Sequence, residues 1–329
     1  MSTDTTSIQS VLDALIAPGR DFPRRYLQQF SDMRPLELKT LQDVWTRVPP
    51  SRKLTLLGAL QSLADEDTLV NFDEFARAVI HDPEPQVRLR AIRLLKECED
   101  HKLAATFLDM LKNDPDLPVR VETASALGLF VDLGELEEIS ESIYRRIEDS
   151  LLATANSDDD PRVRRAALES LGYSSRIEVT TLIESSFHRE DPAWQASALV
   201  AMGRSADERW EDSVLRALAH VNDHVRRAAV QAAGDLEMKS ARPALLKMLG
   251  EEEDDRVMST VIWSLSQVGG EDVRTYLENL LDQTEDEEQV AYLEEALDNL
   301  SFTEDLERFD LVAFDPDADL TDLEEDDEE

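Results

Sequence analysis

The sequence predicts an all-α protein that forms a solenoid, in which each helix hairpin stacks on the next. Three observations predict this fold. A core motif recurs at intervals of 31 or 32 residues, the chain of 329 residues holds only 10 glycines and 13 prolines, and acidic or proline-containing turns precede the motif. This composition suits helices packed on helices better than a turn-rich β protein. A repeat of this length is typical of an α-solenoid.

The core motif is a short amphipathic helix, and we call its first buried residue the anchor. The six anchors are Val87, Val119, Val163, Trp194, Val225 and Val257. The fourth, fifth and eighth positions after an anchor are mostly apolar, which is the spacing of one buried helix face. The seventh position is usually Ala or Ser, which lets two helices approach closely. We expect a glycine after the eighth position to end the helix in the left-handed conformation at Gly128, Gly172, Gly203 and Gly234.

Second helices are expected between the motif helices, for example at 244–250 and 273–282, so that each unit is a hairpin. Asp or Asn before the motif can cap the N-terminus of its helix, and Pro suits the first turn. One hairpin cannot bury its apolar face alone, but stacking buries it for every unit. The interval from Val119 to Val163 is 44 residues, which predicts a longer outer helix or loop there.

Two segments, DDDPRVRRAALESLGY (158–173) and VNDHVRRAAVQAAGDL (221–236), resemble HEAT repeats of the short form shared with phycobilisome-lyase-type proteins. The resemblance covers roughly residues 81–300. It implies antiparallel helix pairs stacked in a right-handed α/α superhelix, with the motif helices lining the concave face. The motif identifies the fold but not the function, because HEAT-type proteins have many activities.

The resemblance also implies a ladder of Asp–Arg pairs between repeats. Asp82, Asp114 and Asp158 lie five residues before an anchor. The residue directly after the anchor is arginine in four motifs, at Arg88, Arg120, Arg164 and Arg226. Gln195 and Met258 take this place in two other motifs, so ion pairing between repeats should be weaker there.

The motif divides the chain into three parts. We expect an N-terminal helical cap with degenerate repeats at 1–80, the HEAT-like array at 81–300 and an acidic C-terminal tail at 301–329. The tail alternates aromatic with acidic residues and includes Phe309 and Phe314. Such a segment can dock on another protein, or it can fold back over the last repeat as a cap. The sequence leaves both alternatives open.

Charge restricts the partners. The formal net charge is -38, and the 45 residues from 285 to 329 hold 21 acidic residues and one basic residue. A surface this negative repels phosphate backbones and anionic lipid heads, so we expect neither nucleic acid nor a membrane as partner. Protein partners remain, basic ones among them. Cys98 is the single cysteine, and we find no signal-peptide pattern or membrane-length apolar run, so we expect a cytoplasmic protein.

No pattern of catalytic, cofactor-binding or metal-ligating residues is found, so we expect no enzyme. His220 and His224 have helical spacing, but Asn222 and Asp223 between them form a turn, which spoils a metal site. Cys98 is expected to be a partly buried small hydrophobic residue. We expect arginines of the motif helices to pair with carboxylates across units rather than with nucleic acid. The arginines are Arg162, Arg164, Arg165, Arg226 and Arg227, and the carboxylates are Asp158, Asp159, Asp160 and Asp223.

A partner surface can be located from the repeat itself. If the second and sixth positions after each anchor face the concave groove, the row contains Val200, Gln231 and Trp263. Trp263 is the exception in a row of mostly small or polar residues, and a large aromatic residue there is typical of an interface hot spot. The alternative is that Trp263 packs on the next helix near Tyr292.

These observations predict a non-catalytic scaffold or adaptor that binds a protein or peptide through its concave face, its acidic tail, or both. The candidate binding residues are Val200, Gln231, Trp263, Phe309 and Phe314. The alternative is a bilin-lyase-like enzyme or enzyme subunit that handles a tetrapyrrole chromophore. A bilin site needs an aromatic pocket with cationic anchors, and the row offers only Trp263 and a few arginines.

Overall fold

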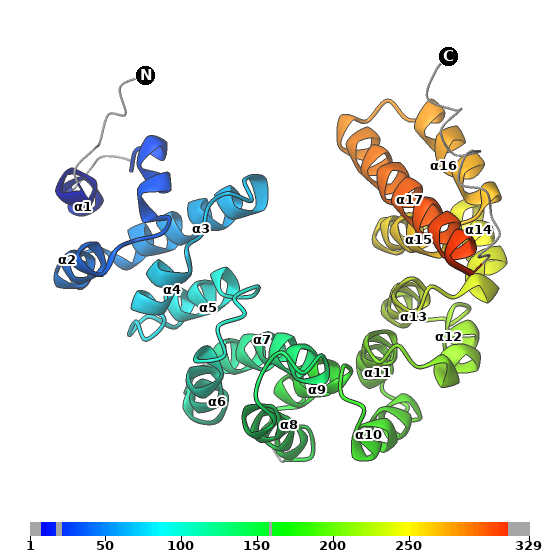
Figure 1. Cartoon of the computed structure of the whole chain (residues 1–329), viewed down its shortest axis with the longest axis horizontal. Helices are drawn as coiled ribbons and strands as arrows, with labels where there is room; N and C mark the ends of the chain where they lie inside the picture. The colour runs from blue at the N-terminus through cyan, green and yellow to red at the C-terminus, as the bar shows by residue number, and fades with distance from the viewer. Residues whose placement is uncertain (1–7, 18–21, 158–159, 315–329) are drawn as a thin grey trace. The chain divides into compact units, whose positions relative to one another are not determined.

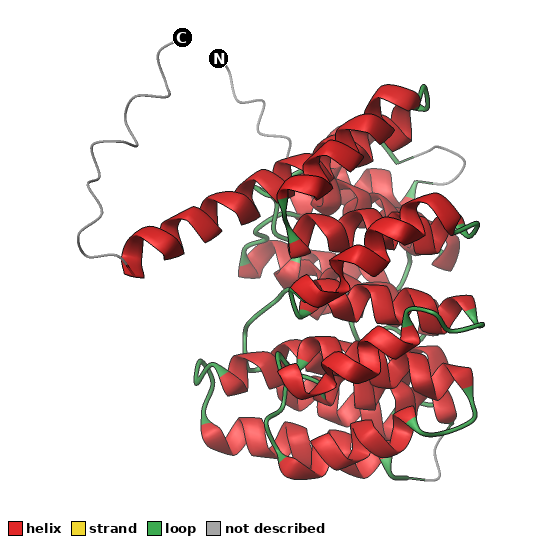
Figure 2. Cartoon of the chain, turned by 90° about the vertical axis from the view of Figure 1, so that its right-hand side faces the viewer, coloured by secondary structure: helices red, strands yellow, loops and turns green. Residues whose placement is uncertain are grey.

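The computed structural model describes residues 8–17, 22–157 and 160–314, and every regular element in these ranges is a helix (Figures 1 and 2). The predicted all-α solenoid of helix hairpins is confirmed. Contacts divide the chain into two compact units, Met1–Val179 and Thr180–Glu329, which we describe separately as unit 1 and unit 2. No described helix is both long enough and apolar enough to cross a lipid bilayer.

Unit 1 contains a 3₁₀ helix at Arg24–Phe30 and the first part of α10 (Ile177–Phe187), which crosses the division. Its α-helices are α1 (Ile8–Ile16), α2 (Pro35–Trp45), α3 (Pro50–Glu66), α4 (Asp73–Val79), α5 (Pro85–Leu94), α6 (Leu103–Asn113), α7 (Leu117–Glu135), α8 (Glu141–Ala155) and α9 (Pro161–Leu171).

Unit 2 contains the rest of α10 and two 3₁₀ turns at Glu208–Trp210 and Lys239–Ala241. Its other helices are α11 (Pro192–Arg204), α12 (Glu211–Ala217), α13 (Asp223–Asp235), α14 (Arg242–Glu251), α15 (Asp255–Val268), α16 (Glu271–Gln283) and α17 (Glu287–Phe314).

The motif helices are α5, α7, α9, α11, α13 and α15, and all six anchors on them are at most 4% exposed. In unit 2, α11, α13, α15 and α17 pack one against the next, while α12, α14 and α16 each pack on the following member of this row. Unit 2 therefore has an inner layer of motif helices and an outer layer of second helices (Figure 1). In unit 1, α5, α7 and α9 likewise pack in succession.

The predicted N-caps are confirmed at several motif helices. The side chain of Asp160 accepts a hydrogen bond from the backbone N–H of Arg162 at 2.9 Å, and Asp254 accepts from Val257 at 3.1 Å. Asp116, Asp191 and Asn222 cap their helices in the same way. Each cap satisfies a backbone donor that the first helical turn leaves free.

The prediction that the motif glycines end their helices in the left-handed conformation was wrong. Gly128, Gly203 and Gly234 lie inside helices, and Gly172 is a C-cap with right-handed φ and ψ. After α7, α11 and α13 the left-handed position is taken three residues beyond a glycine, by Glu137, Ala206 and Glu237. The motif glycines instead make room for the next repeat. A Cβ on Gly203 would lie 3.0 Å from the Cα of Ala232, and one on Gly234 would lie 2.8 Å from the Oγ of Ser264.

The long interval after Val119 lengthens two helices. The motif helix α7 has 19 residues and the outer helix α8 has 15, whereas α9 and α6 have 11 each. The extra length is therefore shared between the motif helix and the predicted longer outer helix. It also places Gly134, in the last turn of α7, against Tyr144 of α8.

The C-terminal end of the array is one long helix. α17 runs without interruption through residue 301, where the predicted tail begins. Thr303 donates a hydrogen bond to the carbonyl of Ser266 at 3.1 Å, and Glu304 pairs with Arg274 at 2.7 Å, so the first residues beyond 300 pack on the last repeat. Residues 315–329, with most of the tail's acidic end, lie outside the described ranges.

Gly134→Ala should destabilise unit 1. The added Cβ would lie 2.1 Å from a ring carbon of buried Tyr144, and overpacking of this kind costs about 1–3 kcal/mol. Gly250→Ala is the matched control, because nothing lies within 4 Å of a Cβ there and alanine is the better helix former. Urea unfolding monitored by circular dichroism measures both. Equal stability of the two variants would contradict the packing account.

Candidate functional site

The predicted binding residues of unit 2 lie on the exposed strip of the motif helices. We call this strip, formed by the second and sixth positions after each anchor, the motif-helix face. Gln231 on α13 is exposed, while Val200 on α11 and Trp263 on α15 are half-buried. The three positions are equivalent on consecutive packed helices. In unit 1 the second and sixth positions after an anchor are not all exposed, because Leu89, a predicted groove position, is buried.

Trp263 and Tyr292 form an aromatic pair on this face. Their ring centroids lie 6.4 Å apart with an interplanar angle of 34°. The Tyr292 hydroxyl donates a hydrogen bond to the backbone carbonyl of Ser259 at 2.8 Å, and burial raises the pKa of Tyr292, so the donor proton is kept at neutral pH. Trp263 thus packs near Tyr292, as the alternative predicted, and both side chains also keep part of their surface open to solvent.

Phe309 and Phe314 lie on the last part of α17. Their side chains are outside the part of the chain that the structure describes, so their proposed contact with a partner stays a prediction. Phe302, earlier on the same helix, is 63% exposed.

Charge pairs link consecutive repeats as the resemblance implied. Arg88 of α5 makes two hydrogen bonds with the carboxylate of Asp114, at 2.8 and 2.7 Å, just before the next motif helix. Arg226 of α13 makes the same paired contact with Glu252, at 2.8 Å for both bonds. Of the arginines expected to pair with aspartates, Arg162 does pair with Asp160 at 3.0 Å, whereas Arg226 pairs with Glu252 instead. Glu252 lies five residues before Val257, so a glutamate here does what aspartate does in other repeats.

A further rung of the ladder lies before the first recognised motif. Asp82 accepts hydrogen bonds from the Lys53 ammonium at 2.6 Å and from the Trp45 indole N–H at 2.7 Å, and both charged side chains are at most 6% exposed. Lys53 was not predicted from the sequence, because the ladder pattern has arginine at the cationic position. The signal was there, since Lys53 lies early in α3 and Asp82 is five residues before an anchor. Lys53 and Asp82 thus take the places of the cation and the carboxylate of a ladder rung, while the degenerate repeats expected at 1–80 stay a prediction.

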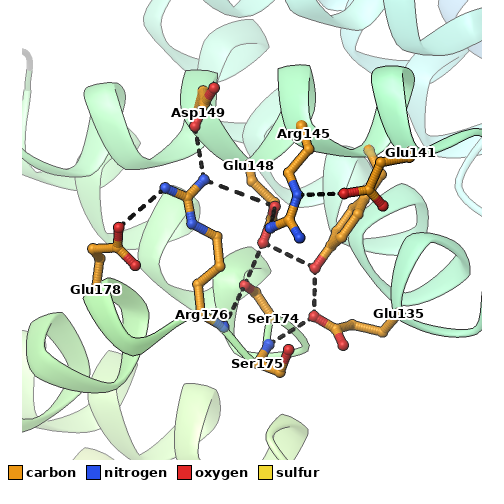
Figure 3. Close-up of polar contacts among 10 residues, drawn as sticks. Glu135, Glu141, Arg145, Glu148, Asp149, Ser174, Ser175, Arg176 and Glu178 are labelled. Atoms are coloured by element: carbon orange, nitrogen blue, oxygen red, sulfur yellow. Dashed lines mark hydrogen bonds and ion pairs between the residues drawn. The ribbon is translucent and has the colours of Figure 1, made fainter.

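A second buried carboxylate lies in the lengthened hairpin of unit 1. Glu148 of α8 is fully buried, and Figure 3 shows the polar side chains that surround it. Its carboxylate accepts hydrogen bonds from Ser174 at 2.5 Å, from Arg145 at 2.9 Å and from Tyr144 at 2.9 Å. Arg176, 3.8 Å away, adds a second positive charge. A buried charge with this many partners is well compensated.

Tyr144 joins two carboxylates in this cluster. Its hydroxyl contacts both Glu148 and Glu135, and Glu135 also accepts a hydrogen bond from the backbone N–H of Ser175 at 2.7 Å. Burial and these two acceptors raise the pKa of Tyr144. The cluster links α7, α8 and the turn before α10 within unit 1. This structural role explains its contacts.

The remaining candidates for chemistry have structural partners. His220 accepts a hydrogen bond from the backbone N–H of Asn222 at 3.1 Å, as expected for a turn residue. Cys98 is buried, accepts a hydrogen bond from Arg77 at 3.1 Å, and has its pKa raised by burial, which keeps the thiol protonated. Among the described residues, no three His, Cys, Asp or Glu side chains are arranged to hold a metal ion.

Comparisons with known proteins agree with this geometry. A family model for HEAT repeats matches residues 211–298. The structure of the CpcE–CpcF complex of phycocyanin lyase from Nostoc sp. PCC7120 is similar to this chain with a TM-score of 0.50 and 16% identity, over 86% of this chain and 97% of that one. Residues 211–298 therefore contain HEAT repeats, which confirms the predicted resemblance, and the similarity to the CpcE–CpcF structure concerns the fold. No curated protein sequence matches the chain.

Two further solved structures are more distant. Human deoxyhypusine hydroxylase has a TM-score of 0.35 and 16% identity, over 79% of this chain and 95% of that one. Kap95p, from a structure with RanGDP, has a TM-score of 0.41 and 15% identity, over 89% of this chain and 41% of that one. At these scores neither similarity bears on function.

Lys53→Met should cost about 3–5 kcal/mol of stability, because it leaves the buried Asp82 carboxylate without its cation. Arg93→Met is the matched control. It removes the more exposed Arg93–Glu122 pair, with Arg93 53% exposed, and should cost at most about 1 kcal/mol. Thermal and urea unfolding measure the difference. A Lys53→Met loss no larger than that of the control would contradict the role of the buried pair.

Tyr144→Phe should destabilise unit 1 by about 1–3 kcal/mol at pH 7, because Glu135 and Glu148 lose a shared donor. The pKa of Tyr144 is raised on folding, so its contribution is present below the ordinary tyrosine pKa of about 10 and is lost as the pH rises above it. The difference in unfolding free energy between the wild type and Tyr144→Phe should therefore become smaller above that pH. Urea unfolding across this range tests it, with exposed Tyr276→Phe as control. A stability difference between the wild type and Tyr144→Phe that does not change with pH would contradict this role of Tyr144.

Proposed function

We propose that this chain is a non-catalytic cytoplasmic adaptor that binds a protein partner through the motif-helix face of unit 2. The observation that carries the proposal is the Trp263–Tyr292 pair, two large aromatic side chains that stay half-exposed on packed helices. Aromatic residues held in place by their neighbours lose little freedom on binding, and such residues dominate interface energetics.

The neighbours of the pair support a protein ligand. Ser259 and Gln231 on the same face are exposed and polar, and Val200 adds a half-buried apolar side chain. An aromatic centre within a polar rim is the usual composition of a protein interface. The net charge of -38 would speed encounters with basic partners and would make binding weaken as salt rises.

Trp263→Ala should lower recovery of the partner at least about tenfold in affinity purification with quantitative mass spectrometry. Tyr276→Ala on the outer helix α16 is the control, because Tyr276 is another aromatic residue of unit 2 and is 50% exposed. Both variants must keep the helical circular dichroism of the wild type. If Trp263→Ala recovers the same proteins in the same amounts, the motif-helix face is not the binding surface.

The acidic tail is the second proposed contact. Since Thr303 and Glu304 already pack on the last repeat, a deletion that begins at residue 303 would also disturb the array. Deleting residues 309–329 keeps Thr303 and Glu304, removes both Phe309 and Phe314, and so separates the two roles. Loss of a partner at unchanged thermal stability supports docking by the tail, and loss of stability supports a cap.

The bilin-lyase-like alternative has its own test. Purified protein mixed with a linear tetrapyrrole would show a shifted visible absorbance if it held the chromophore in an ordered site. The similarity to phycocyanin lyase concerns the fold alone at 16% identity. An unchanged spectrum would leave the adaptor as the function.

A further inference from the structure

An open cavity of about 740 Å³ lies between two outer helices of unit 2. Its walls are α12 with the turn that follows, and α14 with the turn into α15. α12 has only 7 residues, against 10 in α14, so the shorter helix leaves part of its neighbour uncovered. The cavity has the size of a site for a small ligand or for a few side chains of a peptide.

The apolar residues of the lining, which we call the floor, come from both helices. Leu215, Leu218 and Ala219 come from α12 and the following turn, and Ala244 and Met248 come from α14. Val221, two residues beyond Ala219, is 94% exposed. An apolar side chain from outside would therefore meet apolar side chains from both helices.

The charged residues of the lining, which we call the rim, are mainly acidic, with Arg226 and Lys247 beside the carboxylates. The rim contains the consecutive residues Glu251, Glu252, Glu253 and Asp254. Glu252 is held by Arg226, and Asp254 caps α15, so these two carboxylates are committed within the fold. Glu251 makes an ion pair with Lys247 at 3.3 Å, both side chains being at least 65% exposed, which makes this pair weak. Glu253 is exposed and has no ion pair with any described residue.

We propose that this cavity binds a segment of a partner protein in which one apolar side chain is flanked by lysine or arginine. The apolar side chain occupies the floor, and the flanking cations approach Glu251 and Glu253. The chain's own segment 315–329 is a poor occupant, because it carries ten acidic residues and no basic one and the rim repels it. This site lies on the outer helix layer, apart from the motif-helix face, and goes beyond the function proposed above.

The probe is a set of fluorescein-labelled peptides of roughly twelve residues, with a central Leu, Met or Phe and two Lys or Arg on each side. Fluorescence anisotropy with the full chain measures their affinity. At least one member should bind with a Kd below about 1 mM. Replacing its central residue by Ser should weaken binding about tenfold or more, and replacing its basic residues by Glu should abolish binding.

Two variants test whether the peptide binds in the cavity. Ala244→Trp fills the apolar floor from an otherwise unchanged helix, and Glu251→Lys with Glu253→Lys reverses the rim. Each should weaken the peptide about tenfold or more. Glu278→Lys with Asp282→Lys on α16 is the matched control, since both residues are exposed and the net charge changes equally. The control and Trp263→Ala should leave the affinity within about twofold of wild type, which separates this site from the motif-helix face.

Four results would overturn the proposal. They are no binding by any peptide of the set, binding that survives Ala244→Trp and the rim reversal, equal loss in the α16 control, and tighter binding by a peptide of residues 315–329. The last result would identify the chain's own tail as the occupant.

Discussion

The close approach of consecutive motif helices is the contact on which the rest of the structure depends. Each helix presents a small residue or a glycine to the next repeat, so the backbones come within van der Waals distance. The Cα of Ala232 would lie only 3.0 Å from the Cβ of a side chain added at Gly203. Once this spacing is set, the anchors become buried and the outer helices are held at a fixed distance. In unit 2 the outward positions of consecutive motif helices then fall into one row.

Repeated features could be predicted from the sequence, because a period compares each position with its equivalents. The anchors and the N-caps follow from the period, and the Arg88–Asp114 rung follows from the resemblance to short HEAT repeats. The motif glycines were misread because sequence does not distinguish a glycine that ends a helix from one that admits a neighbour. Gly203 and Gly234 lie one residue before the end of their helices and Gly128 lies further inside α7, and at all three positions the next repeat occupies the space that a side chain would need.

Features that occur once could not be predicted. The Glu148 cluster joins side chains from one lengthened hairpin and a turn 26 residues further on, and no other repeat offers a comparison. Lys53 and Glu252 are chemical substitutes in ladder positions, visible only when charge is compared instead of residue type. The cavity beside α12 depends on the length of a helix, which local sequence defines least well. Of the candidate binding residues, Val200, Gln231 and Trp263 were placed on one face by periodicity alone.

The continuous course of α17 has a mechanical consequence. This helix packs on α15 and α16 and then runs on to residue 314 with no turn between the two parts. A flexible linker would absorb a pull on the acidic end as slack. A helix that is anchored along its first half instead transmits the pull to α15, the helix that carries Trp263. Tension at residue 314 would thus pass along the backbone of α17 and reach α15 through side-chain contacts, such as that of Tyr292 with Ser259.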